Sequence, residues 1–111
     1  MKGVIRAVSS IVQDKLYVCG GRADGGVYQS SCYALHGTSW EVQDSLSVAR
    51  YGAAGSRWMG GWLVTGGYGG SSIHSSSDLY RGGVWTSGPT LPTATYRHCQ
   101  VSTDNQVIVA G

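Results

Sequence analysis

The sequence predicts an all-β protein built from one repeated unit of about 46 residues that contains four short strands. An apolar run ending in glycine recurs along the chain, and aromatic residues follow it at similar distances. Glycine makes up 18 of 111 residues, whereas only 13% of residues are charged, a balance typical of closely packed strands and tight turns. No segment has the i, i+3, i+4, i+7 apolar spacing of an amphipathic helix, so we expect almost no helix.

The apolar run marks the repeat most clearly. Residues 16–21 (LYVCGG) recur as residues 62–67 (WLVTGG) and as residues 107–111 (VIVAG), with their first glycines 46 and 45 residues apart. Four more markers recur at a similar period: Tyr33 with Tyr80, Trp40 with Trp85, Leu46 with Leu91, and Arg50-Tyr51 with Arg97-His98. Arg6 also stands as far before Gly20 as Arg97 stands before Gly111. The chain therefore divides into a nearly complete repeat at 1–46, a second at 47–92 and the start of a third at 93–111.

The second repeat shows the expected strands most plainly. They are residues 51–58, 62–66, 77–81 and 84–87. Gly60-Gly61 joins the first two strands, and the glycine-rich residues 68–76 form a longer loop before the third. Gly82-Gly83 supplies the positive φ angles that a two-residue hairpin requires. Pro89 and Pro92 then lead out of the sheet, because proline lacks the N–H group that a central strand needs.

Charge and hydropathy exclude several classes of partner. Eight Lys and Arg against six Asp and Glu give a net charge of +2, and no two basic residues are adjacent, so we expect no binding to nucleic acid. No stretch approaches the roughly 18 apolar residues of a membrane-spanning helix. The first residues run into repeat sequence without the apolar region of a signal peptide. We therefore expect no membrane partner.

The cysteines and histidines fit no local metal-binding spacing, so we expect no metal and no cofactor. Cys19 ends an expected second strand and Cys32 begins the third. If these strands are antiparallel neighbours, the two sulfurs lie near enough for a disulfide, whereas Cys99 has no candidate partner in the chain. A disulfide would indicate an extracellular protein and reduced thiols a cytosolic one, so both compartments stay open.

Four short strands per repeat, with glycine and aromatic markers each time, are typical of a propeller blade. The continuous apolar runs fit blades that are buried on both faces. At these positions the chain resembles the kelch repeat, in which an apolar strand ends in Gly-Gly and is followed by a Tyr, a Trp, a Leu and an opening Arg. Six residues separate Tyr33 from Trp40, the commonest kelch spacing, and four separate Tyr80 from Trp85, which we attribute to a shorter hairpin. The Gly-His and Trp-Asp dipeptides of the WD40 repeat are absent.

The resemblance implies a partial kelch β-propeller of four-stranded antiparallel blades, whose remaining blades come from other residues or another chain. It also implies a non-catalytic module that binds another protein or a peptide through its loops. In kelch propellers the binding loops join strand two to strand three and strand four to the next blade, which here are residues 22–30, 68–76, 44–50 and 88–97. The candidate partner-binding residues in or beside them are Arg22, Asp24, Tyr28, Arg50, Tyr68, Arg97 and His98.

Arg22 follows the first Gly-Gly, where some kelch substrate receptors place an arginine that contacts an acidic peptide, and exposed Arg and Tyr are favoured interface anchors. The recurrence of Arg50 and Arg97 leaves a structural role open for both. The resemblance allows a substrate-recruiting propeller of a BTB-kelch ubiquitin-ligase adaptor, an actin-binding protein or an extracellular kelch protein. An enzyme of the copper radical oxidase type would need Tyr, His and Cys ligands gathered near the axis. The sequence contains no such motif and no catalytic Ser-His-Asp grouping, so we expect no enzyme.

Overall fold

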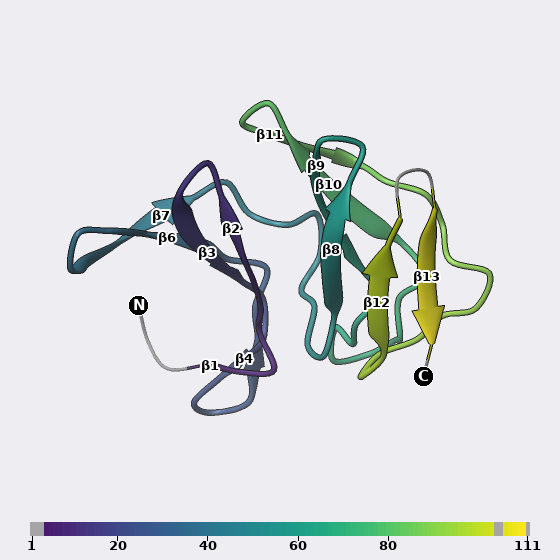
Figure 1. Cartoon of the computed structure of the whole chain (residues 1–111). Coiled ribbons are helices and arrows are strands. Elements are labelled where there is room, and N and C mark those ends of the chain that lie inside the picture. Colours follow the sequence, from purple (N-terminus) through teal and green to yellow (C-terminus); the bar gives the residue numbers. More distant parts are fainter. Residues whose placement is uncertain (1–3, 104–105, 111) are drawn as a thin grey trace.

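The computed structural model describes residues 4–103 and 106–110, and within these residues the chain forms strands, turns and loops without a helix. The all-β class is therefore confirmed. Two four-stranded antiparallel sheets and one two-stranded sheet follow one another along the chain and lie side by side, as Figure 1 shows. No helix that could cross a membrane occurs in the described part of the chain.

Each four-stranded sheet is built from consecutive hairpins. The first contains β2 (Val8–Val12), β3 (Lys15–Cys19), β6 (Cys32–His36) and β7 (Ser39–Gln43). The second contains β8 (Ala54–Trp58), β9 (Gly61–Thr65), β10 (Ser77–Arg81) and β11 (Val84–Ser87). The two-stranded sheet pairs β12 (Cys99–Ser102) with β13 (Val107–Ala110). A small sheet of β1 (Val4–Ile5), β4 (Arg22–Ala23) and β5 (Val27–Tyr28) lies at one end of the first.

The strands of the second sheet agree closely with the sequence-based expectation. The third and fourth strands and the Gly82-Gly83 turn between them are confirmed residue for residue. The second strand begins one residue earlier than expected, because the preceding turn is formed by Met59 and Gly60, both with positive φ. The first strand is shorter than expected and begins at Ala54. Gly52 has a φ of 70°, which interrupts the extended chain after Tyr51.

The strand pairing corrects one equivalence between the repeats. Tyr80 and Leu35 each pair with the tryptophan of the following strand, so these two residues are equivalent. The sequence comparison had matched Tyr80 with Tyr33, which was wrong. The residue equivalent to Tyr33 is Asp78, because both pair with the same valine position of the second strand. Both hairpins consequently have a two-residue turn, and the shorter hairpin inferred for the second repeat does not exist.

The backbone hydrogen bonds also correct the expected equivalence of Arg50-Tyr51 with Arg97-His98. The N–H of Gly21 donates to the Arg50 carbonyl at 2.7 Å, and the N–H of Gly67 donates to the Thr95 carbonyl at 2.8 Å. Arg50 is therefore equivalent to Thr95, two positions before Arg97. The match of Arg50-Tyr51 with Arg97-His98 was wrong because it followed the identity of one arginine and not the backbone pairing.

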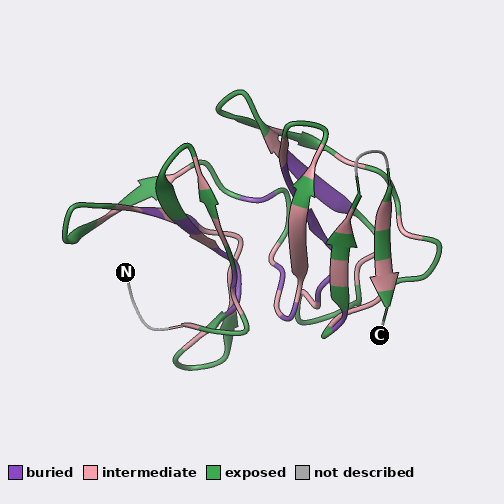
Figure 2. Ribbon diagram, viewed as in Figure 1, coloured by how far each residue is buried: buried purple, intermediate pink, exposed green. Residues whose placement is uncertain are grey.

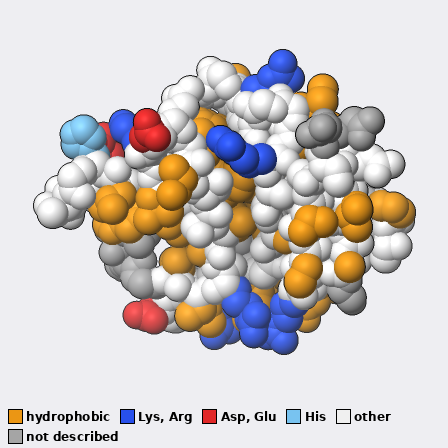
Figure 3. All heavy atoms as spheres, in the orientation of Figure 1, with side chains coloured by type: hydrophobic (Ala, Val, Ile, Leu, Met, Phe, Trp, Pro, Cys, Tyr) orange, Lys and Arg blue, Asp and Glu red, His pale blue; other side chains and the backbone are white. Residues whose placement is uncertain are grey.

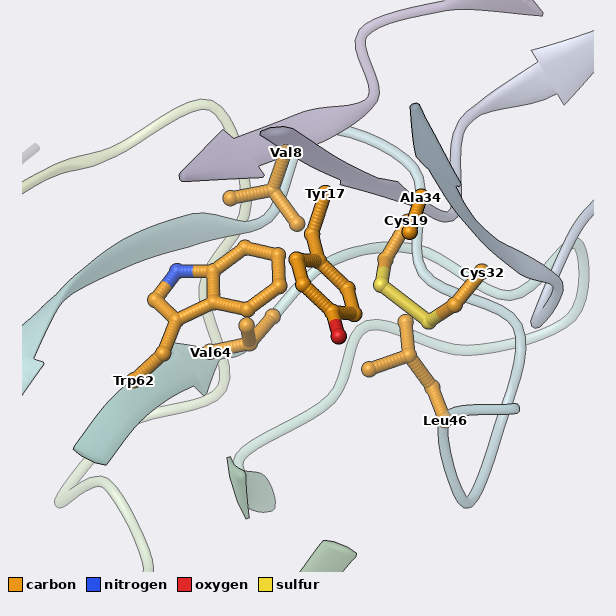
Figure 4. Packing of buried hydrophobic residues seen from close by; sticks show 8 residues of the cluster. All are labelled: Val8, Tyr17, Cys19, Cys32, Ala34, Leu46, Trp62 and Val64. Carbon is orange, nitrogen blue, oxygen red and sulfur yellow. A yellow bond between two sulfur atoms is a disulfide. The ribbon is translucent and has the colours of Figure 1, made fainter. Parts of the chain in front are cut away.

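The main core lies between the two four-stranded sheets. Figure 4 shows its buried hydrophobic residues, which are Val8, Tyr17, Cys19, Cys32, Ala34, Leu46, Trp62 and Val64. The Trp62 indole and the Tyr17 ring point toward one another across the gap between the sheets. Figure 2 shows that burial is concentrated on the inner strands, whereas turns and outer strands are exposed. Burying such side chains contributes roughly 1.5–3 kcal/mol each, so this interface fixes the position of the two repeats relative to one another.

A disulfide joins the second and third strands of the first sheet. Cys19 and Cys32 are directly paired residues of β3 and β6, and both are completely buried. The pairing that the sequence left open is thus present. Their equivalents in the second sheet are Thr65 and Ser77, so the cross-link is confined to the first repeat. Cys99 is exposed and has a free thiol.

Candidate functional site

The four loops expected to bind a partner are joined to one another by backbone hydrogen bonds. Residues 44–50 contact residues 22–30, because the Leu46 N–H donates to the Ser30 carbonyl at 2.9 Å. Residues 88–97 contact residues 68–76 in the same way, through the Leu91 N–H and the Ser75 carbonyl at 2.7 Å. Together with β1, β4 and β5 they form what we call the loop end. Its strands β1 and β4 lie opposite the β8–β9 turn in Figure 1.

Four tyrosines from different loops meet at the loop end, and we call them the tyrosine cluster. The Tyr28 ring lies edge-on to Tyr51, with centroids 5.7 Å apart, and edge-on to Tyr68 at 5.3 Å. Tyr68 in turn lies 5.8 Å from Tyr96. Each aromatic contact contributes about 0.5–1.5 kcal/mol beyond the burial of its area, so the rings hold one another in place. All four side chains are half-buried and leave part of each ring accessible.

Two exposed arginines flank the tyrosine cluster. The Nη2 of Arg97 donates to the Tyr51 hydroxyl at 3.5 Å, and its guanidinium carbon lies 5.7 Å from the Tyr96 ring centroid. The guanidinium carbon of Arg6 lies 5.9 Å from the Tyr51 centroid. The hydrogen bond from Arg97 lowers the pKa of Tyr51 and raises that of Arg97. Figure 3 shows basic side chains gathered at this edge of the molecule, between β4 and the lower ends of β8 and β12.

The backbone brings these arginines together. The Gly52 N–H donates to the Arg6 carbonyl at 3.0 Å, and the Arg97 N–H donates to the Gly52 carbonyl at 2.7 Å. The three residues occupy equivalent positions in successive repeats, two residues before the first strand of each sheet. All three have positive φ, at 53°, 70° and 56°. Stacking of the repeats thus places Arg6 and Arg97 on either side of a glycine.

Four of the seven candidate residues lie at the accessible loop end around the tyrosine cluster. Arg22 is exposed, and its backbone pairs with both Ile5 and Tyr28. Asp24 is exposed in the turn between β4 and β5. Tyr28 and Tyr68 belong to the tyrosine cluster itself. A fifth candidate, the exposed Arg97 described above, completes the set that solvent can reach.

Arg50 is not accessible to a partner. The whole residue is 1% exposed, its Nε donates to Asp78 Oδ2 at 3.2 Å, and its Nη1 donates to the carbonyls of Gly66 at 2.6 Å and Ser76 at 3.0 Å. Burial lowers the pKa of Arg50, and the Asp78 carboxylate opposes that shift. The guanidinium therefore links the loop before β8 to the second sheet. This is the structural role that the sequence left open, and it removes Arg50 from the binding candidates.

His98 is also buried, with 8% of its surface exposed. The amide nitrogen of Gln100 donates to Ser56 and to the Leu63 carbonyl, so its oxygen accepts from the Thr65 hydroxyl. The His98 Nε2–H consequently donates to the Thr65 oxygen at 2.8 Å, which leaves Nδ1 as an acceptor without a partner among the described residues. Burial lowers the pKa of His98 and keeps the imidazole neutral.

Sequence reasoning missed three residues of the loop end, Arg6, Tyr51 and Tyr96. A signal for Arg6 was present, because its distance from the first glycine of the repeat equals that of Arg97. Tyr51 and Tyr96 are 96 − 51 = 45 residues apart, which is one period of the repeat. The shifted match of Arg50 with Arg97 concealed this tyrosine pair.

The fold and the loop end together define an all-β repeat protein of successive four-stranded antiparallel sheets with a tyrosine- and arginine-rich surface at one end. Comparison with protein-family models and with curated protein sequences finds no match. Among solved structures, the chain is similar to the structure of YjhT, with a TM-score of 0.81 at 16% sequence identity. The similarity covers 97% of this chain and 38% of that chain, and at this identity it shows the fold alone.

Proposed function

We propose that this chain is part of a kelch-type β-propeller that serves as a protein–protein interaction module and binds its partner through the loop end. Two observations support the propeller. The chain forms two successive four-stranded sheets, each with a doubled glycine after its second strand, and the pair β12–β13 follows them in the same order as the first two strands of each sheet. In this arrangement each sheet is one blade. The proposal assigns the strands to packing and the loops to binding, the usual division in such proteins.

The tyrosine cluster is the observation that carries the proposed binding function. Tyrosine offers a large amphipathic contact area and loses little conformational freedom on binding, and tyrosine and arginine are enriched among the residues that dominate binding energy. Here the rings are already ordered by contacts with one another. Backbone pairing of Tyr51 with Tyr68 further fixes the loops that carry them. A preorganised surface of this kind binds with a smaller entropy loss than mobile loops do.

The charges at the loop end favour a partner segment that is acidic or rich in hydrogen-bond acceptors. Arg6, Arg22 and Arg97 are exposed there, and Asp24 is the acidic residue of the β4–β5 turn. Complementary charge raises the rate of association and orients the partner. Among the roles that the resemblance allows, the disulfide between Cys19 and Cys32 favours an extracellular kelch protein over a cytosolic BTB-kelch ubiquitin-ligase adaptor.

The test compares two double variants of the full-length protein. Arg22→Ala with Tyr28→Ala alters the loop end, and Arg57→Ala with Met59→Ala alters exposed residues at the opposite end. Partners captured by the unmodified protein are identified, and their affinities for each variant are measured. We expect the loop-end variant to lose at least tenfold in affinity, about 1.4 kcal/mol, and the opposite-end variant to bind normally. Retained binding by the loop-end variant, with loss in the other, would contradict the proposal.

A further inference from the structure

We propose that a pocket on the first sheet binds the guanidinium group of a ligand, because the equivalent place in the second sheet already holds one. The pocket has a volume of about 540 Å³, within the range of small-ligand sites, and lies between the first sheet and the strands β1, β4 and β5. Its lining includes the exposed residues Asp24 and Val27, so solvent reaches it. The inference goes beyond the proposed function, because the pocket shares no lining residue with the tyrosine cluster.

In the second sheet this place is occupied by the side chain of Arg50. Its Nη1 donates to the carbonyls of Gly66 and Ser76, and its Nη2 donates to Ser76 Oγ at 3.1 Å. Its Nε donates to the Asp78 carboxylate. The guanidinium therefore lies where the second and third strands of the sheet end their pairing, and backbone carbonyls supply part of its binding site.

The first sheet presents the same backbone acceptors to the pocket. Gly20 and Ser31 are equivalent to Gly66 and Ser76, because each pair flanks the last paired residues of the second and third strands. The Gly20 N–H donates to the Ser31 carbonyl at 2.9 Å, and the Gly66 N–H donates to the Ser76 carbonyl at 3.0 Å. The two glycines also have similar φ angles, 73° and 67°. Gly20 and Ser31 both line the pocket, so the carbonyl arrangement that holds a guanidinium in one sheet is repeated in the other.

The residue of the first repeat that is equivalent to Arg50 is Val4. The residue after Arg50 pairs with Tyr68, and the residue after Val4 pairs with Arg22. Tyr68 and Arg22 each directly follow the doubled glycine of their repeat, which establishes the equivalence. Val4 lines the pocket, but its side chain is short and has no hydrogen-bond donor. In the first sheet the guanidinium must therefore come from a ligand.

The other lining residues suit a cation on an aliphatic stem. A guanidinium carries five N–H donors and no acceptor, which matches two carbonyls and the Ser31 hydroxyl. Tyr33 stands at the position of Asp78, and the Asp24 carboxylate lines the pocket and supplies a negative charge there. Val18 and Val27 provide apolar surface for the stem. The shared chemistry is that of small guanidino compounds and of the arginine side chain of a peptide.

The experiment uses the full-length protein with ¹⁵N-labelled glycine and follows the backbone amide signals by NMR. The probes are ethylguanidinium chloride, the peptide acetyl-Gly-Arg-Gly-amide and its citrulline analogue, which is uncharged. We expect the Gly20 signal to shift with the first two probes, and at least about tenfold weaker binding of the citrulline peptide. The matched control is Gly66, which should not shift because Arg50 already occupies its site. Tighter binding of the arginine peptide than of ethylguanidinium would identify a peptide ligand, and the reverse would identify a small guanidino compound.

The first variant fills the site from within the chain. Val4→Arg should abolish the probe-dependent shift of Gly20, because the new side chain takes the position that Arg50 has in the second sheet. The double variant Val4→Arg with Tyr33→Asp rebuilds the whole arrangement of the second sheet. It should therefore unfold at a higher temperature than either single variant. Retained probe binding by Val4→Arg, or a double variant no more stable than both single variants, would overturn the inference.

A second pair of variants leaves the core untouched. Asp24→Asn should weaken binding of ethylguanidinium about threefold, as expected for an exposed charge. Asp14→Asn, in the β2–β3 turn at the other end of the first sheet, is the matched control and should bind normally. Equal affinities of these two variants, no shift of Gly20, or equal shifts of Gly20 and Gly66 would contradict the proposed site.

Discussion

Replacing Arg50 with methionine should destabilise the protein more than any exposed substitution, because it breaks a buried ion pair on one side only. The Arg50 side chain is 0% exposed and that of Asp78 is 4% exposed, so water does not screen the pair. Without the guanidinium, Asp78 keeps the Ser47 N–H at 3.1 Å, and the carbonyls of Gly66 and Ser76 lose their side-chain donor. Removing one partner of such a pair typically costs about 3–5 kcal/mol.

A loss of this size is a large fraction of the roughly 5–15 kcal/mol by which a domain is stable. The assay is urea unfolding of the full-length protein followed by tryptophan fluorescence. Arg81→Met, at an exposed position, is the matched control and should change the free energy of unfolding by less than about 0.5 kcal/mol. The double variant Arg50→Met with Asp78→Leu should recover most of the loss, because it removes the unpaired carboxylate. A loss below about 1 kcal/mol for Arg50→Met, or a double variant no more stable than the single, would refute this reasoning.

Three further predictions concern stability. Cys19→Ser should lower the free energy of unfolding by about 3 kcal/mol, as expected for a disulfide that spans 13 residues, whereas Cys99→Ser should leave it unchanged under the same non-reducing conditions. Because burial lowers the pKa of His98, the unfolded chain takes up a proton there before the folded chain does. Stability should therefore fall as the pH drops below about 6.5, by at most about 1.4 kcal/mol per pH unit, and His98→Gln should flatten this dependence in pH-resolved unfolding curves. Gly20→Ala should lower the free energy of unfolding by about 1–3 kcal/mol more than Gly25→Ala does, as measured by thermal or urea unfolding. Both glycines have positive φ, but only at Gly20 would the new methyl group overlap a backbone carbonyl oxygen. Equal losses would contradict this packing argument.

The parts of the fold that sequence predicted best are those fixed by local chemistry. The last two strands of the second sheet were predicted residue for residue, because Gly82-Gly83 specifies a two-residue turn and β-branched and aromatic residues surround it. The start of β8 was missed, because the positive φ of Gly52 depends on hydrogen bonds to neighbouring repeats. The match of Tyr33 with Tyr80 failed because residue identity outweighed strand register, which only the pairing reveals.

The candidate site was predicted in part for the same reason. Tyr28 and Tyr68 lie in loops that a repeat alignment can place, so they were found. Tyr51 and Arg6 reach the site through the stacking of one repeat on the next, which a single sequence does not display. The burial of Arg50 was equally hidden, because Arg50 lies in a loop and its partner Asp78 lies in β10 of the second sheet, 28 residues away in the sequence.

Site-specific photo-crosslinking shows directly whether the loop end contacts the partner. A photoreactive amino acid is placed in the full-length protein at Asp24, in the β4–β5 turn, or at Met59, in the β8–β9 turn at the opposite end. Both positions are exposed, so neither substitution disturbs the core. We expect a covalent adduct with one partner protein from position 24 and none from position 59. Adducts from position 59 alone, or from neither position, would contradict it.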